Sequence, residues 1–254
     1  MRRFFISSQQ VNDNVVIITG ADVNHIGNVL RLRAGDELIL SDGMNFEYQV
    51  EISEIHSSKI RATILKKERI DLLSPQVTLV QAIPKGAKMD TIVRQATELG
   101  VSSVIPVITS RTVVRLSREK KEKKRERWQN IAKEAAEQSQ RSSLPAVSTV
   151  CGWDEALQKM ASNDLAVAFW EEASELFSER VFIRFQEGKK PEKEELGNCC
   201  ILIGPEGGFS SDEIRDLDSQ GIHCFSLGKQ ILRTETASAV ALGIFFYELT
   251  KLGR

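Results

Sequence analysis

Two different rhythms of hydrophobic and polar residues divide the chain. Up to about residue 70 the apolar positions come in short runs, and segments 46–52 and 59–64 alternate apolar with polar residues. Such alternation is typical of half-exposed strands, and the short turns between the runs predict a small β-barrel. Further strands are expected at 3–6, 15–18 and 37–40. One helix is expected at 22–29, where Asp22 can serve as the N-terminal cap.

From Gln76 onward, apolar runs alternate with segments of helical spacing, which is typical of an α/β fold with a mostly parallel sheet. The predicted strands are 77–82, 104–108, 147–150, 165–169, 199–203 and 224–226. The predicted helices are 89–99, which Gly100 should end, 117–139, 153–161, 211–219 and 234–252. The charged segment 66–75 is interpreted as a linker, so the predicted domains are 1–70 and 71–254.

Composition limits the classes of protein to consider. A chain of 254 residues with 41% hydrophobic and 27% charged residues is typical of a soluble globular protein. No apolar run approaches the roughly 20 residues of a membrane span, and the N-terminus lacks the apolar region of a signal peptide. We therefore expect a cytoplasmic protein. The four cysteines form no CxxC pair and only three histidines accompany them, so we expect reduced thiols and no metal site.

Charge is distributed unevenly although the net charge is only −1. Segment 115–127 holds eight positive and three negative residues, a local excess of +5, and the N-terminal segment contributes further arginines. Local basic surfaces on a nearly neutral protein suit a partner with concentrated negative charge, such as RNA. A solvated helix face with intrahelical ion pairs explains segment 115–127 equally well, and the sequence leaves both readings open.

The densest motif is segment 201–210, ILIGPEGGFS, where an apolar run enters a Gly/Pro turn and Ser210 precedes a helix. A second loop, 226–236, follows the next apolar run in the same way. Ligands of open α/β sheets bind at the carboxyl ends of strands, so these loops predict one shared pocket. The chain lacks GxGxxG and GxxxxGK[ST], so neither a dinucleotide site nor a P-loop is indicated. An ordinary glycine turn is the alternative interpretation of the first loop.

Arg233 has no structural explanation in this pattern. Thr234 can cap the last predicted helix, and Glu235 in its first turn suits the helix dipole. A cation at the same end opposes the dipole, so we expect Arg233 to contact a phosphate or a base carbonyl. Glu206 gives the first loop a charge that can attract a cationic ligand.

The segments IGPEGGFS and SLGKQILRTETA resemble the bacterial methyltransferases that modify N3 of a uridine in 16S ribosomal RNA, which belong to the SPOUT class. Segments 25–31, 97–101 and 134–139 match the same family, and the similarity covers essentially the whole chain. The resemblance implies a PUA-like β-barrel that binds RNA, followed by a trefoil-knot α/β domain that binds S-adenosylmethionine. It also implies a homodimer acting on 16S ribosomal RNA of the small ribosomal subunit, with no DNA or membrane partner.

Site residues are carried over from the family onto the matching positions. The resemblance implies a cofactor site lined by Trp170, Glu171, Ile203, Gly204, Pro205, Glu206, Gly207, Gly208, Leu227, Gly228, Ile231, Leu232, Arg233, Thr236 and Ala237. RNA is expected to contact Arg2, Arg3, His25, Arg31, Arg33, Arg111, Arg115 and Arg141. A core or capping role is an equal alternative for His25.

The expected chemistry requires loss of the proton on uridine N3. Arg233 is the candidate that stabilises the resulting anion, and Glu206 or Glu235 the candidate that accepts the proton. For Glu206 we favour a different role, in which its carboxylate steadies the charge of the cofactor. Two alternatives to this function remain open. One is another SPOUT methyltransferase acting on tRNA or a ribose 2′-hydroxyl, and the other is a non-catalytic RNA-binding assembly factor.

Overall fold

The computed structural model describes residues 1–71, 75–114, 116–177 and 197–252. Contacts between Cα atoms group the chain into two compact units. The first unit contains Met1–Leu72 together with Lys133–Leu144, and the second contains Leu73–Ala132 and Pro145–Arg254. A division of the chain at residue 70 does not anticipate that 133–144 joins the N-terminal residues. The predicted domain boundaries themselves stay a prediction.

The first unit is built on one six-stranded sheet with the order β1-β4-β5-β6-β3-β2. Strands β1 and β4 are parallel, and the other neighbours are antiparallel. The strands are β1 (Arg2–Phe5), β2 (Val11–Asn12), β3 (Val15–Thr19), β4 (Glu37–Ser41), β5 (Phe46–Ile55) and β6 (Lys59–Arg69). The short helical elements are η1 (Ser8–Gln10), α1 (Ala21–Asn24) and η2 (His25–Val29). A continuous apolar core that includes Ile18, Leu40 and Ile60 fills this unit.

Two local predictions in this unit are wrong. Asp22 does not cap the helix, because Gly20 occupies the N-cap position and Asp22 lies in the first turn. The Asp22 carboxylate instead accepts a hydrogen bond from Lys133 Nζ at 2.7 Å. Segment 66–75 does not begin a linker at residue 66, because β6 continues to Arg69. The charged end of β6 pairs with Phe46–Gln49 of β5, where exposed side chains remain in solvent while the backbone completes the ladder.

Side chains hold residues 133–144 in the first unit. The last turns of helix α3 (Arg118–Gln138) carry Glu137, whose Oε1 accepts a hydrogen bond from the backbone N–H of Phe5 at 3.2 Å. Ser41 Oγ donates to the carbonyl of Ser142 at 2.6 Å. Burial raises the pKa of the Glu137 carboxyl, and the hydrogen bond from Phe5 partly opposes that rise.

The second unit is built on a seven-stranded sheet in which every pairing among the described residues is parallel. Its order is β10-β8-β7-β12-β11-β13, with β9 paired to β8. The strands are β7 (Gln76–Ala82), β8 (Ser103–Ile108), β9 (Ala146–Val147), β10 (Cys151–Gly152), β11 (Leu165–Phe169), β12 (Asn198–Ile203) and β13 (His223–Phe225). Parallel pairing aligns the ends of β7, β12 and β11, where Gln81 is opposite Ile203 and Ile203 is opposite Phe169.

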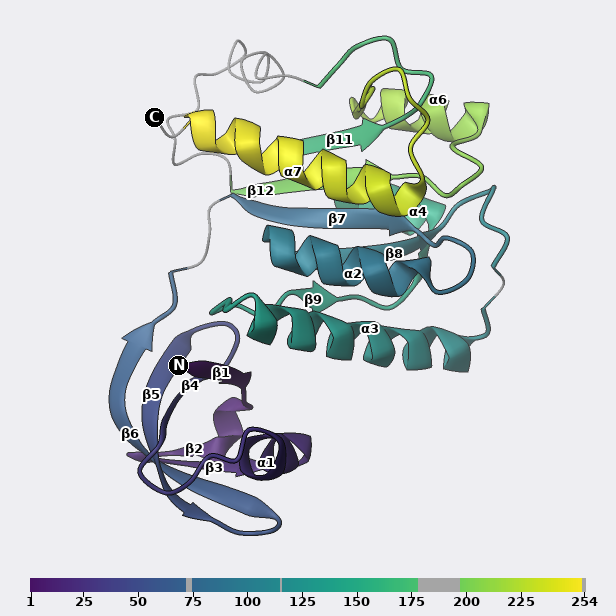
Figure 1. Cartoon of the computed structure of the whole chain (residues 1–254). Coiled ribbons are helices and arrows are strands. Elements are labelled where there is room, and N and C mark those ends of the chain that lie inside the picture. Colours follow the sequence, from purple (N-terminus) through teal and green to yellow (C-terminus); the bar gives the residue numbers. More distant parts are fainter. Residues whose placement is uncertain (72–74, 115, 178–196, 253–254) are drawn as a thin grey trace. The chain divides into compact units, whose positions relative to one another are not determined.

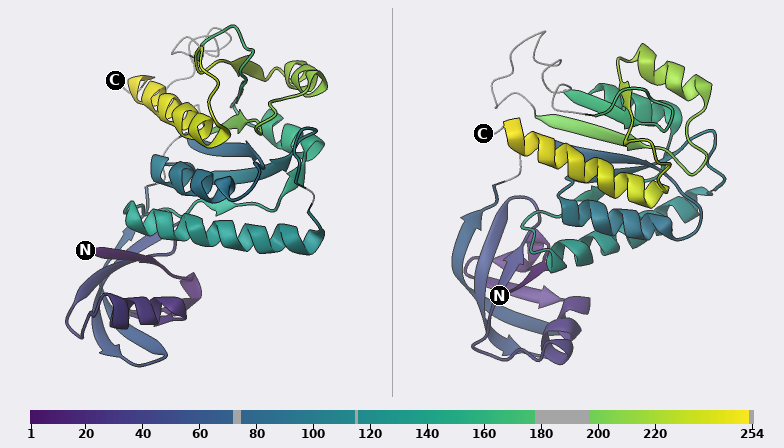
Figure 2. Two further views of the ribbon diagram at one scale, coloured as in Figure 1. Left: turned by 45° about the vertical axis from the view of Figure 1, so that its right-hand side comes forward. Right: turned by 45° about the horizontal axis from the view of Figure 1, so that its top comes forward.

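Helices cover both faces of this parallel sheet (Figures 1 and 2). Successive residues of β7 alternate between two cores, so Val77 and Leu79 pack on one side and Val80 and Ala82 on the other. The first core also holds residues of α2 (Lys88–Leu99), α3 and α7 (Thr234–Leu252). The second core holds residues of α4 (Trp153–Ala161) and α6 (Ser211–Ser219). Helices on both faces explain why these strands read as continuous apolar runs.

The predicted strand 147–150 is wrong in its extent. The chain pairs with β8 twice, first through β9 opposite Ser103 and Val104, and then through β10 opposite Val107 and Ile108. Pro106 separates the two paired segments of β8 and has no N–H to donate, which explains the interruption.

The α/β class with a mostly parallel sheet is confirmed. Gly100 ends α2 with φ 115°, as predicted, because its left-handed conformation favours glycine. The threaded, trefoil-knot path stays a prediction. Within the described residues, no helix is long and apolar enough to cross a membrane, and no group of three or more His, Cys, Asp or Glu side chains could hold a metal ion.

Candidate active site

A cavity of about 270 Å³ opens at the carboxyl ends of β11, β12 and β13 and at the start of α7. It lies where the two loops predicted from the sequence come together. Its lining residues are Phe169, Trp170, Glu171, Ile203, Gly204, Pro205, Glu206, Gly208, Ser226, Leu227, Gly228, Gln230, Ile231, Leu232, Arg233, Thr234 and Ala237. The wall therefore combines apolar side chains, glycine backbone and a few charged groups, as expected of a small-molecule site.

Gly208 shapes the loop after β12. Its φ is +66°, and its N–H donates to the carbonyl of Pro205 at 3.0 Å, which closes the turn. A Cβ at this position would lie 2.2 Å from Oε1 of Glu171, so only glycine lets the Glu171 carboxylate approach the loop.

The far end of the same loop is fixed by a capping box. Ser210 Oγ accepts a hydrogen bond from the Glu213 N–H, and Glu213 Oε2 accepts from the Ser210 N–H at 2.9 Å. The other carboxylate oxygen of Glu213 accepts from the Ser110 N–H at 2.7 Å, and only 3% of Glu213 is exposed. Glu213 therefore joins the loop after β8 to the loop after β12.

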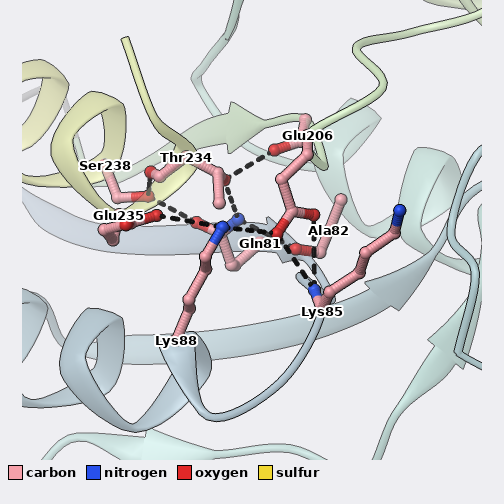
Figure 3. A network of polar contacts seen from close by, with 9 residues as sticks. Gln81, Ala82, Lys85, Lys88, Glu206, Thr234, Glu235 and Ser238 are labelled. Carbon is pink, nitrogen blue, oxygen red and sulfur yellow. Dashed lines mark hydrogen bonds and ion pairs between the residues drawn. The ribbon is translucent and has the colours of Figure 1, made fainter.

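Glu206 lines the cavity, but its carboxylate is bound by the protein itself (Figure 3). Lys88 Nζ donates to Glu206 Oε1 at 2.7 Å, and the Lys85 N–H lies 3.2 and 3.3 Å from the two carboxylate oxygens. Burial favours a higher pKa for Glu206, but the hydrogen bonds from Lys88 and the backbone outweigh it and lower the pKa. Glu206 therefore stays ionised and is a weak proton acceptor.

Glu235 lies on the other side of Lys88. Its Oε2 is 3.8 Å from Lys88 Nζ, and this buried oxygen has no hydrogen-bond partner among the described residues. The hydrogen bond to Glu206 raises the pKa of Lys88, burial lowers it, and the charge of Arg233 lowers it further. The result is a raised pKa, so Lys88 remains a cation between the two predicted carboxylates.

Arg233 borders the cavity at the N-terminus of α7 and is exposed. Among the described residues its guanidinium has no hydrogen-bond or ion-pair partner, while its carbonyl accepts from the Ala237 N–H at 2.8 Å. An unpaired guanidinium at the edge of a cavity is available to an anionic or carbonyl-bearing ligand.

Comparison with known proteins now decides the family. A model described as an RNA methyltransferase domain matches residues 72–246, and one described as an RNA methyltransferase PUA domain matches residues 18–65. The chain belongs to this RNA methyltransferase family.

Relatives of the family match the chain over nearly its whole length. Ribosomal RNA small subunit methyltransferase E of Bacillus subtilis is 37% identical over 253 residues, covering 98% of this chain and 97% of the relative. The crystal structure of the Neisseria gonorrhoeae protein of that name, bound to S-adenosyl methionine, has a TM-score of 0.80 at 30% identity and 95% coverage of both chains. A Legionella pneumophila methyltransferase with bound cofactor SAM has a TM-score of 0.82 at 28% identity and 96% coverage of both.

The structure of this family member brings together most of the predicted cofactor residues. Gly207 and Thr236 are the two exceptions, since neither lines the cavity. The carbonyl of Gly207 accepts a hydrogen bond from Arg111 Nη1 at 2.7 Å, and Thr236 is exposed on the first turn of α7. Sequence reasoning missed four lining residues, Phe169, Ser226, Gln230 and Thr234. These four directly adjoin predicted positions, so proximity along the chain was the available signal.

The predicted RNA contacts have varied surroundings. In the first unit Arg2, Arg31 and Arg33 are exposed, and the His25 ring makes an edge-to-face contact with Phe4. The Arg3 side chain is only 9% exposed and forms an ion pair with Glu47. Arg115 lies outside the described residues. Their contacts with RNA stay predictions.

Two predicted arginines have definite structural partners. Burial lowers the pKa of Arg141 to about 10, and Nη2 of Arg141 donates to Ser143 Oγ at 3.2 Å. Arg111 holds the loop after β12 through its bond to Gly207, a role that the sequence did not indicate. Lys88, also missed, is one of several lysines that follow a strand, and its partner is distant along the chain.

Proposed function

We propose that this protein transfers a methyl group from S-adenosylmethionine to N3 of a uridine in 16S ribosomal RNA. The observation that carries the proposal is the cavity formed by the two glycine-containing loops with the unpaired Arg233 at its edge. The names of the relatives support ribosomal RNA as the substrate, and the cofactor bound in two structural relatives supports the methyl donor. The resemblance of the loops to uridine-N3 methyltransferases supports the target atom.

The residues of the cavity fit the proposed cofactor. Ile203, Leu227 and Leu232 offer apolar wall suited to a flat adenine ring, and the backbone at Gly204 can approach a ligand closely. Glu171 provides a carboxylate, for which the described residues contain no hydrogen-bond or ion-pair partner, and which suits a cationic ligand. When bound, S-adenosylmethionine supplies a methyl group on a positively charged sulfur.

The proposed mechanism assigns separate roles to the charged residues. Uridine N3 must lose its proton before it can act as a nucleophile, and Arg233 stabilises the negative charge that then develops on a base carbonyl oxygen. Glu206 holds the loop through Lys88 and Lys85, and its lowered pKa makes it a poor acceptor. Glu235, with one buried oxygen lacking a hydrogen-bond partner among the described residues, is the remaining candidate acceptor of the proton.

The experiment that tests the function is a comparison of ribosomal RNA nucleosides from cells with and without this gene, by mass spectrometry. We expect 3-methyluridine in 16S RNA to disappear with the gene. Loss of a ribose methylation or of a tRNA methylation would instead support the other SPOUT activities. Calorimetry with purified protein and S-adenosylmethionine tests the assembly-factor alternative, for which we would observe no binding at high micromolar ligand.

The proposed partners are RNA and a second copy of the chain, in the cytoplasm. The PUA match and the exposed arginines of the first unit support RNA binding, which should weaken strongly with salt. The exposed apolar side chains Ile231, at 87%, and Tyr247, at 62%, support a homodimer. Light scattering should give twice the monomer mass of 28.4 kDa, and a monomer mass would refute the dimer.

A further inference from the structure

Gln81 is a fully buried polar residue near the end of the apolar strand β7. An amide placed in an apolar core costs free energy unless its groups are hydrogen-bonded. Gln81 Nε2 donates to the Ala82 carbonyl at 2.9 Å and to Thr234 Oγ1 at 3.1 Å, and Gln81 Oε1 accepts from Ser238 Oγ at 2.6 Å (Figure 3). Two of its three bonds therefore go to helix α7, more than 150 residues away in sequence.

The acceptors fix the direction of this hydrogen-bond chain. The Gly204 carbonyl can only accept, so Thr234 Oγ1 must use its single proton to donate to it, at 2.8 Å. Thr234 Oγ1 then accepts from Gln81 Nε2, which turns the amide oxygen of Gln81 toward Ser238. The chain thus runs from Ser238 through Gln81 and Thr234 to Gly204, each donor pointing toward the loop after β12. Aligned bonds of this kind strengthen one another in a buried site.

The chain joins three segments that must keep fixed positions around the cavity. Gly204 belongs to the loop after β12, Thr234 opens α7 beside Arg233, and both line the cavity. Gln81 and Ser238 do not line the cavity, yet every path of the chain passes through them. The sheet therefore holds both cavity loops through one amide.

We propose that Gln81 is a positioning residue of the cofactor site, which holds the Gly204 loop and the first turn of α7 at the spacing that the bound ligand requires. The identity of that ligand as S-adenosylmethionine rests on the proposed function. The role of Gln81 does not, because it concerns the order of two loops in the protein itself.

The test replaces Gln81 with methionine, which has a similar length and cannot form these bonds. Amide hydrogen exchange should accelerate in segments 203–209 and 226–236 of Gln81→Met, since these loops lose their shared anchor. The dissociation constant for S-adenosylmethionine, measured by calorimetry, should rise about tenfold, which corresponds to the loss of one or two buried hydrogen bonds. Ser238→Ala should give a smaller rise, and the double variant should match Gln81→Met, because both changes break one chain.

Thr78→Val is the matched control. Thr78 lies on the same strand, three residues before Gln81, and its Oγ1 bonds Ser103 Oγ at 2.7 Å, away from the cavity. This variant should lower the melting temperature while leaving the cofactor affinity and the exchange of both loops unchanged. If Gln81→Met fails to fold, Ser238→Ala carries the same comparison.

The possible results separate the two proposals. Gln81→Met or Ser238→Ala behaving like Thr78→Val, with lower stability but normal loop exchange and affinity, would overturn the positioning role. Failure of the wild-type protein to bind S-adenosylmethionine would overturn the proposed cofactor, while hydrogen exchange of the two loops would still decide the role of Gln81.

Discussion

Gly208 provides the sharpest test of how the cavity wall is built. The substitution Gly208→Ala has two separable effects, since φ is +66° and the new Cβ would lie 2.2 Å from Glu171 Oε1. A non-glycine residue in the left-handed region costs about 1 kcal/mol. The carboxylate must also withdraw by about 0.8 Å to reach 3.0 Å, below which real Cβ contacts essentially never occur.

The withdrawal costs little stability because the Glu171 side chain is exposed, but it displaces a charged part of the cavity wall. We therefore expect the free energy of unfolding in urea to fall by about 1 kcal/mol. The dissociation constant for S-adenosylmethionine, measured by calorimetry, should rise about tenfold, equivalent to about 1.4 kcal/mol.

Gly221→Ala is the matched control for this substitution. Gly221 has nearly the same φ, +69°, and a Cβ there would meet no atom within 4 Å. Gly221 follows α6 and does not line the cavity, so its replacement should lose similar stability with unchanged cofactor affinity. Equal cofactor affinities for Gly208→Ala and Gly221→Ala would refute the account of the Glu171 contact.

Three further predictions follow from charge and burial. Lys88→Met should raise the pKa of Glu206 above its ordinary range, because burial then acts without the opposing hydrogen bond, and carboxyl NMR titration would detect this rise or its absence. The wild-type pair should stabilise the fold above the ordinary carboxyl pKa and lose that effect as acid protonates Glu206, a pH dependence that Lys88→Met should lack. Glu47→Gln should lower the free energy of unfolding by about 1 to 3 kcal/mol, measured in urea, because Arg3 is largely buried against it. The Cys199 thiol, whose pKa burial raises to about 12, should resist alkylation at pH 8 until the protein unfolds, and rapid labelling of the folded protein would contradict its burial.

Local patterns were sufficient to predict the elements that pack directly on the parallel sheet. The observed bounds of α4, β11, α6 and α7 agree with the predicted ranges, since each element buries a regular apolar face. Errors arose where long-range pairing overrides local composition. Charged residues up to Arg69 extend β6 because β5 is available to pair with them, and Pro106 divides the strand expected at 147–150.

The candidate site shows the same division. Glycine, proline and helix-start signals were enough to predict both cavity loops, because those signals are local in sequence. The partners of the charged groups were not predictable, since Lys88 and Glu206 are 118 residues apart. Gln81 did carry a signal, because a glutamine inside an apolar strand of a two-sided sheet requires partners. The sequence could not indicate that those partners lie on the last helix.

The central claim is that the cavity beside Arg233 methylates RNA, and single-turnover methyl transfer tests it most directly. Small ribosomal subunits from cells lacking this gene would be mixed with excess enzyme and labelled S-adenosylmethionine, and the 16S RNA nucleosides then separated. We predict label in 3-methyluridine with the wild-type enzyme and a rate about 100-fold lower with Arg233→Ala at saturating substrate. Label in no RNA nucleoside, or an undiminished rate for Arg233→Ala, would contradict the account.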